Sequence, residues 1–163
     1  MEWIANKKLH NLIEKSSHYQ KNNNVNISNK NIKSLFSPKF YIYDGNIIVS
    51  NTDKSDLLLN TETAKLLGET CNIETEACCN ETRINDYFNS QLNIYDAINF
   101  SLISIEIWLA ELKKIVPERK FCFILGCDKN YVTFRFHQYL TNEIWISENL
   151  ERFFQATGYF ISS

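Results

Sequence analysis

The chain has 163 residues, of which 44% are hydrophobic and 13% aromatic, so its composition is that of a globular protein and excludes a disordered one. A chain of this length buries roughly 68 to 70% of the surface that it exposes when unfolded, and it needs neither a metal nor disulfides to complete a core. Lys and Arg number 17 against 19 Asp and Glu, and the net charge of −2 gives no basic field that would favour a nucleic acid as partner.

The N-terminal segment does not have the pattern of a secretory signal, because Glu2 stands where positive charge is expected and Lys7 and Lys8 precede any long apolar run. The five cysteines contain no C-x-x-C pair of a zinc site, and we interpret them as free thiols of a reducing compartment. We therefore expect a cytoplasmic protein with no cofactor and no metal. Acidic and polar residues interrupt the apolar stretch from Ile94 to Val116, so we expect no membrane span.

A single domain over residues 1–163 is expected, with a helix and a polar, Asn-rich linker over 1–38 and the main body over 39–163. Helical spacing of apolar residues predicts an amphipathic helix over 2–16. In F-Y-I-Y-D-G-N-I-I-V-S, Asp44 and Gly45 fit a two-residue hairpin turn. Pairing across this turn places one apolar set on a single face, which we expect to be buried: Phe40, Ile42, Ile47 and Val49.

The middle of the chain predicts helices. Two short ones are expected over 63–69 and 84–90, separated by an acidic loop with the sequence C-N-I-E-T-E-A-C-C-N-E. A long helix over 93–116 is predicted from apolar residues at intervals of three and four. Asn93 can cap its first turn and Pro117 ends it. Its wide apolar surface is typical of a helix that lies across a sheet and is mostly buried.

The C-terminal third predicts strands. Residues 121–125 form a fully apolar run suited to a central strand, and residues 131–139 alternate as a half-buried strand does. A further strand is expected around Ile144 and Ile146, then a short helix after Ser147 and a last strand over 159–161. The predicted fold is α+β, with an antiparallel sheet of about five or six strands packed against a long central helix and shorter helices.

A run in this third, N-Y-V-T-F-R-F-H-Q-Y-L-T-N-E-I-W-I-S-E-N-L-E-R-F-F, resembles a pattern of small bacterial immunity proteins. In those proteins a V-T-L-R-F-H strand precedes E-x-W-L and then D-L-E. The matching residues are Val132, Thr133, Arg135, Phe136, His137, Glu143, Trp145, Leu150 and Glu151, within residues 121–161. Phe134, Ile146 and Asn149 depart from the pattern. The resemblance implies an immunity protein that binds and neutralises a cognate toxin of a polymorphic or contact-dependent growth-inhibition system by occlusion, without catalysis.

Charge suggests where such a partner would bind. Residues 1–39 contain seven Lys and two Glu, whereas residues 44–81 contain eight acidic and two basic residues. A cluster of one sign can attract a basic toxin cleft, of a nuclease above all, although a merely solvated surface has the same composition. The partner-binding residues that we expect are Asp53, Asp56, Glu62, Glu69, Glu74 and Glu76, with Tyr41 and Tyr43 as aromatic anchors.

Two alternatives remain. Arg135 and His137 point to the same side of a predicted strand, and Glu143 follows the next turn, so a carboxylate could hold an imidazole for acid–base catalysis in a small enzyme. The same trio is equally an ion pair on the exposed side of a sheet. The sequence contains neither a phosphate-binding glycine loop nor a G-x-S-x-G or H-E-x-x-H motif. The second alternative to an immunity protein is a regulatory module that joins a larger assembly through the long helix.

Overall fold

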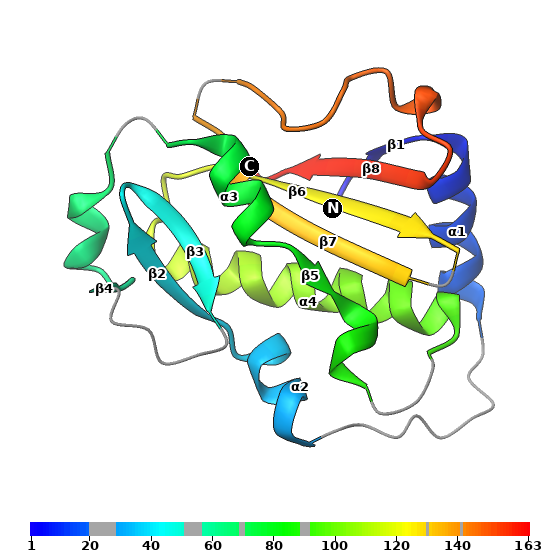
Figure 1. Cartoon of the computed structure of the whole chain (residues 1–163), viewed down its shortest axis with the longest axis horizontal. Coiled ribbons are helices and arrows are strands. Elements are labelled where there is room, and N and C mark those ends of the chain that lie inside the picture. The colour runs from blue at the N-terminus through cyan, green and yellow to red at the C-terminus, as the bar shows by residue number, and fades with distance from the viewer. Residues whose placement is uncertain (20–28, 51–56, 69–70, 89–91, 130, 141) are drawn as a thin grey trace.

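The computed structural model describes residues 1–19, 29–50, 57–68, 71–88, 92–129, 131–140 and 142–163 (Figure 1). Its fold is α+β, as predicted, with two antiparallel sheets. The larger sheet has the strand order β1 (Ile4–Ala5), β8 (Ala156–Ile161), β6 (Phe121–Asp128), β7 (Tyr131–Gln138) and β5 (Thr82–Arg83). The smaller sheet has the order β3 (Asn46–Ser50), β2 (Lys39–Tyr43) and β4 (Leu57–Leu58). The apolar run expected to form a central strand is therefore at the centre, in β6.

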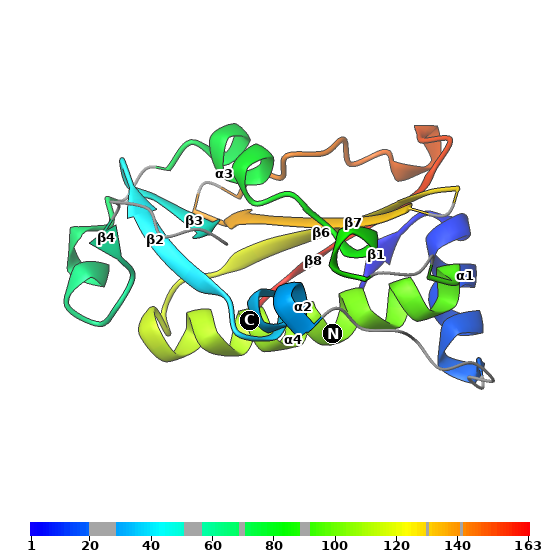
Figure 2. The same cartoon turned by 60° about the horizontal axis from the view of Figure 1, so that its bottom comes forward.

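Helices cover both faces of the larger sheet (Figure 2). On one face lie α4 (Ile94–Ile115), α1 (Lys7–His18) against α4, and α2 (Asn29–Phe36). On the other face lie α3 (Ile73–Cys79) and a segment of residues 142–155, called here the covering segment. Short 3-10 helices occur at η1 (Thr63–Leu66), η2 (Ile84–Tyr87) and η3 (Leu150–Arg152). Within the described residues, no helix combines the length and apolar character that crossing a bilayer requires.

The core lies between α4 and the larger sheet. Trp108 of α4 is fully buried and makes edge-on contacts with three phenylalanine rings, Phe40 at 5.8 Å, Phe134 at 4.9 Å and Phe136 at 6.1 Å between centroids. Its indole Nε1 donates a hydrogen bond of 2.7 Å to the carbonyl of Leu35, which attaches α2 to the same core. The long buried helix is thus confirmed.

The predicted hairpin is confirmed residue by residue. Ile42 pairs with Ile47 and Phe40 with Val49 across a turn in which Asp44 and Gly45 have φ of 48° and 76°. Positive φ at both turn residues belongs to the type I′ turn that matches strand twist. Phe40 and Ile47 are buried in the core, as expected for this face, and Ile42 and Val49 pack against it.

Four local predictions were wrong, and each has a physical reason. The N-terminal helix begins at Lys7, because Ile4 and Ala5 pair with β8 and the Asn6 side chain accepts a hydrogen bond from the backbone N–H of Leu9. Residues 29–36 form α2 where a polar linker was expected, while residues 20–28 lie outside the described chain. The expected loop over 71–81 contains α3, which Asn72 caps through the N–H of Thr75.

The fourth is the strand expected around Ile144 and Ile146, which is irregular. One edge of β7 pairs with β6, and β5 pairs with Thr133 and Phe134 on the other edge. Farther along that edge, Asn80 bonds the carbonyl of Phe136 and Glu76 the N–H of Gln138, so these backbone groups are not open to a further strand. Ile144, Trp145 and Ile146 pack instead on the outer face of the sheet against a small apolar cluster that includes Ile124.

Candidate functional site

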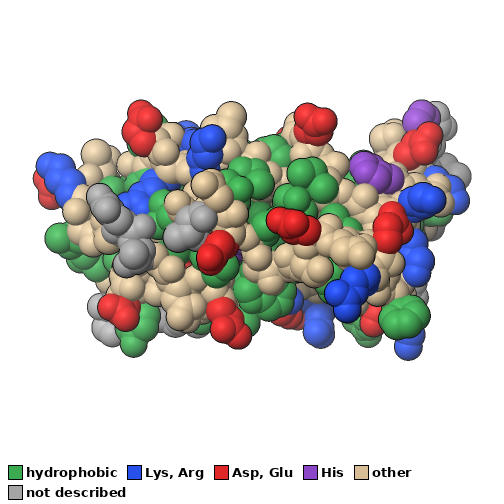
Figure 3. Space-filling view, turned by 90° about the horizontal axis from the view of Figure 1, so that it is seen from above, with side chains coloured by type: hydrophobic (Ala, Val, Ile, Leu, Met, Phe, Trp, Pro, Cys, Tyr) green, Lys and Arg blue, Asp and Glu red, His purple; other side chains and the backbone are tan. Residues whose placement is uncertain are grey.

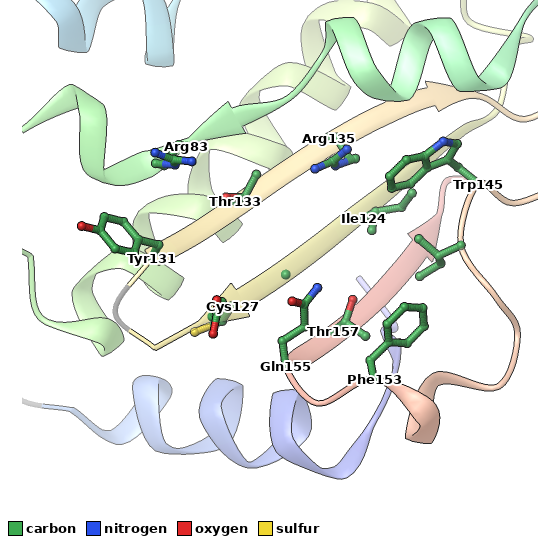
Figure 4. A pocket seen from close by; sticks show the side chains of 13 residues that line it. Arg83, Ile124, Cys127, Tyr131, Thr133, Arg135, Trp145, Phe153, Gln155 and Thr157 are labelled. Atoms are coloured by element: carbon green, nitrogen blue, oxygen red, sulfur yellow. The ribbon is translucent and has the colours of Figure 1, made fainter.

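A cleft opens on the face of the larger sheet opposite α4 (Figure 4). Its volume is about 580 Å³. Ile124 and Gly126 of β6 form part of its floor, and side chains from β5, β7, β8 and the covering segment surround it. We call it the arginine cleft, and its lining residues are Arg83, Ile124, Gly126, Cys127, Asp128, Tyr131, Thr133, Arg135, Trp145, Ile146, Phe153, Gln155 and Thr157.

Two guanidinium groups line one side of the cleft. Arg83 of β5 pairs with Thr133 of β7, so Arg135, two residues along β7, lies diagonally from Arg83 on the same face of the sheet. The Arg135 guanidinium lies 4.5 Å from the ring centroid of Trp145, and that of Arg83 lies 5.5 Å from the ring centroid of Tyr131. Both distances are within the range of cation–π contacts. Arg135 also donates a hydrogen bond of 2.5 Å to the carboxylate of Glu81.

His137 lies beneath the covering segment and is fully buried. Its Nδ1 lies 2.8 Å from the carbonyl of Gln138, and the backbone N–H of Trp145 lies 3.4 Å from its Nε2. Because a carbonyl can only accept, Nδ1 carries the proton and Nε2 is the acceptor, which is the neutral tautomer. Burial lowers the pKa of His137 below its ordinary value, against a smaller opposing effect of the Gln138 hydrogen bond.

Two other residues of the resemblance, Leu150 and Glu151, also hold the covering segment in place. Leu150 is buried in the cluster with Ile124 and Tyr159. The carboxylate of Glu151 accepts a hydrogen bond of 3.0 Å from the backbone N–H of Lys7, at the first residue of α1. An acidic side chain at a helix N-terminus is favourable electrostatically. His137, Leu150 and Glu151 therefore form a frame that positions Trp145 and the cleft wall.

The predicted pair of Glu143 and His137 is not formed. Both ring nitrogens of His137 engage backbone groups, and Glu143 is exposed. The alternative of an ion pair within the trio is not formed either, because Arg135 pairs with Glu81 and not with Glu143. No sequence pattern predicts that partner, since β5, which brings Glu81 and Arg83 beside β7, contains only two residues.

Three of the five thiols are poor nucleophiles. Burial raises the pKa of Cys71 and of Cys122 to about 12, and that of Cys127 to about 11. For Cys71 the nearby Glu76 carboxylate contributes as well, and for Cys127 the Asp128 carboxylate does. A thiol with such a pKa is protonated at neutral pH, and the thiolate is the reactive form.

The predicted partner-binding residues separate into three groups. Glu62, Glu74 and Tyr43 are exposed. Glu76 and Tyr41 are buried, with 0% and 6% of their surface exposed, so the expectation that they present charge and an aromatic ring to a partner was wrong. Glu76 bonds backbone N–H groups, and Tyr41 lies between β3 and β4. Asp53, Asp56 and Glu69 lie outside the described residues. On the face in Figure 3, acidic side chains are dispersed rather than gathered.

The smaller sheet carries a different feature. Four exposed side chains lie in this sheet and in the adjoining η1, and we call them the apolar patch: Tyr43 (61% exposed), Leu57 (47%), Leu58 (47%) and Leu66 (65%). A shallow hollow of about 710 Å³ adjoins it, lined by Leu66 and by the hairpin turn residues Asp44 and Gly45, among others. Sequence reasoning placed Tyr43 here, but not the leucines.

The fold and the cleft together define an α+β protein whose open sheet face is framed by a covering segment. The chain belongs to the Uncharacterized protein PM0498 family, whose model matches residues 4–163. No curated protein and no solved structure matches the chain.

Proposed function

We propose that this protein is an immunity protein that binds a cognate bacterial toxin, of the nuclease type, and inhibits it by covering the toxin's active site. The proposal rests on the resemblance of the C-terminal third and on one structural observation, the apolar patch. Leu58 pairs with Tyr41 and so lies on the same face of the smaller sheet as Tyr43, whereas Leu57 lies on the other face. Exposed apolar side chains that gather on one face mark interaction sites. A few central side chains, tyrosine among the most frequent, provide most of the binding energy at such a site, and Tyr43 is the aromatic member of the patch.

The surroundings of the apolar patch favour a basic partner. Asp44 follows Tyr43 directly and Glu62 directly precedes η1, whereas Lys65 of η1 is the basic residue next to Leu66, so near the patch the chain has two acidic residues against one basic residue. A hydrophobic centre with a polar rim is the usual anatomy of a protein interface. Acidic groups at the rim would speed association with the positively charged cleft of a nuclease.

The patch is also preorganised. Leu57 and Leu58 pair with Ile42 and Tyr41 of β2. The Thr63 hydroxyl donates a hydrogen bond of 3.0 Å to the carbonyl of Leu58, and Asn60 accepts from the N–H groups of Glu62 and Thr63. A surface that is ordered before binding loses less conformational entropy when the complex forms.

The two alternatives have less support. His137 is neutral, buried and bonded to the backbone through both nitrogens, which leaves it unsuited to exchange protons with a substrate. The long helix α4 packs against β7, α1 and α2, so most of its surface is already used inside the fold.

The experiment is binding to the toxin domain encoded next to this gene, measured by calorimetry with inhibition of the toxin as second readout. Leu58→Asp and Leu66→Asp should each weaken binding about tenfold or more, because a carboxylate then enters the apolar centre of the interface. Ile103→Asp on α4 is the matched control, since Ile103 is also 47% exposed. Reversing the charge of Glu62 and Glu74 should slow association at low salt and matter less at high salt.

Absence of binding to any neighbouring toxin domain would overturn the proposed function. If Ile103→Asp weakens binding as much as Leu58→Asp does, the protein still binds a toxin, but the apolar patch is not the contact surface.

A further inference from the structure

We propose that the arginine cleft is a binding site for a small organic anion, with a carboxylate or phosphoryl group held between Arg83 and Arg135 and a flat apolar body against Trp145 and Phe153. The site lies on the larger sheet, on other elements than the apolar patch, and the proposal does not depend on the toxin.

The two guanidinium groups of the cleft favour an anion, although the Asp128 carboxylate also lines it. Arg83 and Arg135 are diagonal neighbours on one face of the sheet, where like charges repel. Glu81 pairs with Arg135, whereas in the described part of the chain no carboxylate forms an ion pair with Arg83. A guanidinium has five N–H donors in a planar fork that matches a carboxylate or a phosphate. Arg135 uses one of its terminal nitrogens for Glu81, so the two groups retain donors for a ligand.

Arg135 is positioned before any ligand arrives by its bond to Glu81 and by a ring contact, whereas the exposed Arg83 has a ring contact alone. Arg135 lies against Trp145, and Arg83 against Tyr131. The Trp145 wall is itself fixed, because its backbone N–H bonds His137. Arg135 has only 19% of its side chain exposed, and partial burial strengthens its attraction to an anion relative to water.

The cleft has an apolar end as well. Figure 4 shows three apolar side chains gathered at one end of the cleft: Ile124, Trp145 and Phe153. Arg135 and Arg83 follow one another along one side, with Arg135 nearer to this end, and Gln155 and Thr157 lie across from them. The volume of about 580 Å³ lies within the range of small-molecule sites. The anionic group and the apolar body of one ligand would therefore have separate places.

Gly126 is an independent sign that the cleft is kept open. A Cβ at this position would meet only the carbonyl of Thr133, at 4.0 Å, so neighbouring groups do not require glycine here. Glycine in the interior of a strand is nevertheless destabilising by roughly 0.5 to 1 kcal/mol relative to alanine. Since Gly126 lines the cleft floor in the central strand β6, a larger side chain would occupy the space of the ligand.

Calorimetry on the full chain tests the site with four probes: phenyl phosphate, phenylacetate, inorganic phosphate and benzyl alcohol. At least one of the two aromatic anions should bind with one-to-one stoichiometry, about tenfold or more tighter than inorganic phosphate, and benzyl alcohol should not bind. The comparison of phenyl phosphate with phenylacetate identifies the anionic group.

Variants locate the binding. Arg83→Gln and Gly126→Leu should each weaken the tighter aromatic anion about tenfold or more, while Lys65→Gln, an exposed control on η1, should not. Thermal unfolding of the free variants verifies that they are folded. If Arg83→Gln fails to fold, Arg83→Lys takes its place, because lysine keeps the charge but lacks the planar fork of donors. Failure of both aromatic anions to bind at about 10 mM, or equal binding by wild type and Arg83→Gln, overturns the proposal.

Discussion

Single residues in the C-terminal third have structural tasks that their chemistry alone does not reveal. His137 has the type and the strand position of a catalytic base, yet it connects the end of β7 to the covering segment through Gln138 and Trp145. Its neighbour two residues earlier, Arg135, faces the cleft and retains access to solvent. The difference comes from the covering segment, which lies over His137 and not over all of β7.

The buried imidazole predicts acid sensitivity. Because the folded pKa of His137 is lowered, the unfolded chain binds the proton first, and the free energy of unfolding should fall as pH drops through the ordinary histidine value of about 6.5 and below. His137→Gln should lack this pH dependence of the free energy of unfolding. At neutral pH its free energy of unfolding should be about 1 to 3 kcal/mol lower than that of the wild type, because the hydrogen bonds of the side chain are altered. Urea denaturation across pH measures both. His10→Gln, exposed on α1, should retain the wild-type profile, and a parallel profile for His137→Gln would contradict the assignment.

At the level of elements, the predictable part of the fold is its long periodic segments. The hairpin, α4, β6 and β7 have enough residues for a period of two or of 3.6 to stand out. Strands β1, β4 and β5 contain two residues each, too few for any period, and they exist only because a longer neighbour offers a free edge. These short strands bring Glu81, Arg83 and Leu58 to their places, which is why the cleft and most of the patch could not be predicted.

The short strand β1 depends on a glycine. Gly158 of β8 pairs with Ala5, and a Cβ at Gly158 would lie 2.6 Å from the Ala5 Cβ and 2.8 Å from the carbonyl oxygen of Ile4. Gly158→Ala should therefore push β1 from β8 and lower the free energy of unfolding by about 1 to 3 kcal/mol. Gly126→Ala in β6 has room for its methyl group and should be neutral or slightly stabilising. Equal stability of the two variants in denaturant titrations would contradict this contact.

On the scale of the whole molecule, α3 joins the two sheets. Asn80, directly after α3, accepts a hydrogen bond of 2.7 Å from the N–H of Val49 in the smaller sheet and donates to the carbonyl of Phe136 in the larger one. Glu76, one turn earlier, accepts from the N–H of Ile47 and from the backbone and side chain of Gln138. The prediction from the acidic residues of 44–81 put Glu76 on the surface. It was wrong because a count of charges does not show which carboxylates bond buried N–H groups.

This junction can be tested at Glu76. In Glu76→Gln the amide NH2 would oppose an N–H donor, so the free energy of unfolding should fall by about 2 kcal/mol. Burial raises the pKa of Glu76 against the opposing effect of its hydrogen-bond donors. The folded state therefore retains the proton to higher pH than the unfolded chain does. The difference in free energy of unfolding between the wild type and Glu76→Gln should therefore become smaller as pH rises from about 4.5. Glu74→Gln, exposed on the same helix, is the control. If denaturation shows both variants equally stable at every pH, Glu76 does not join the sheets.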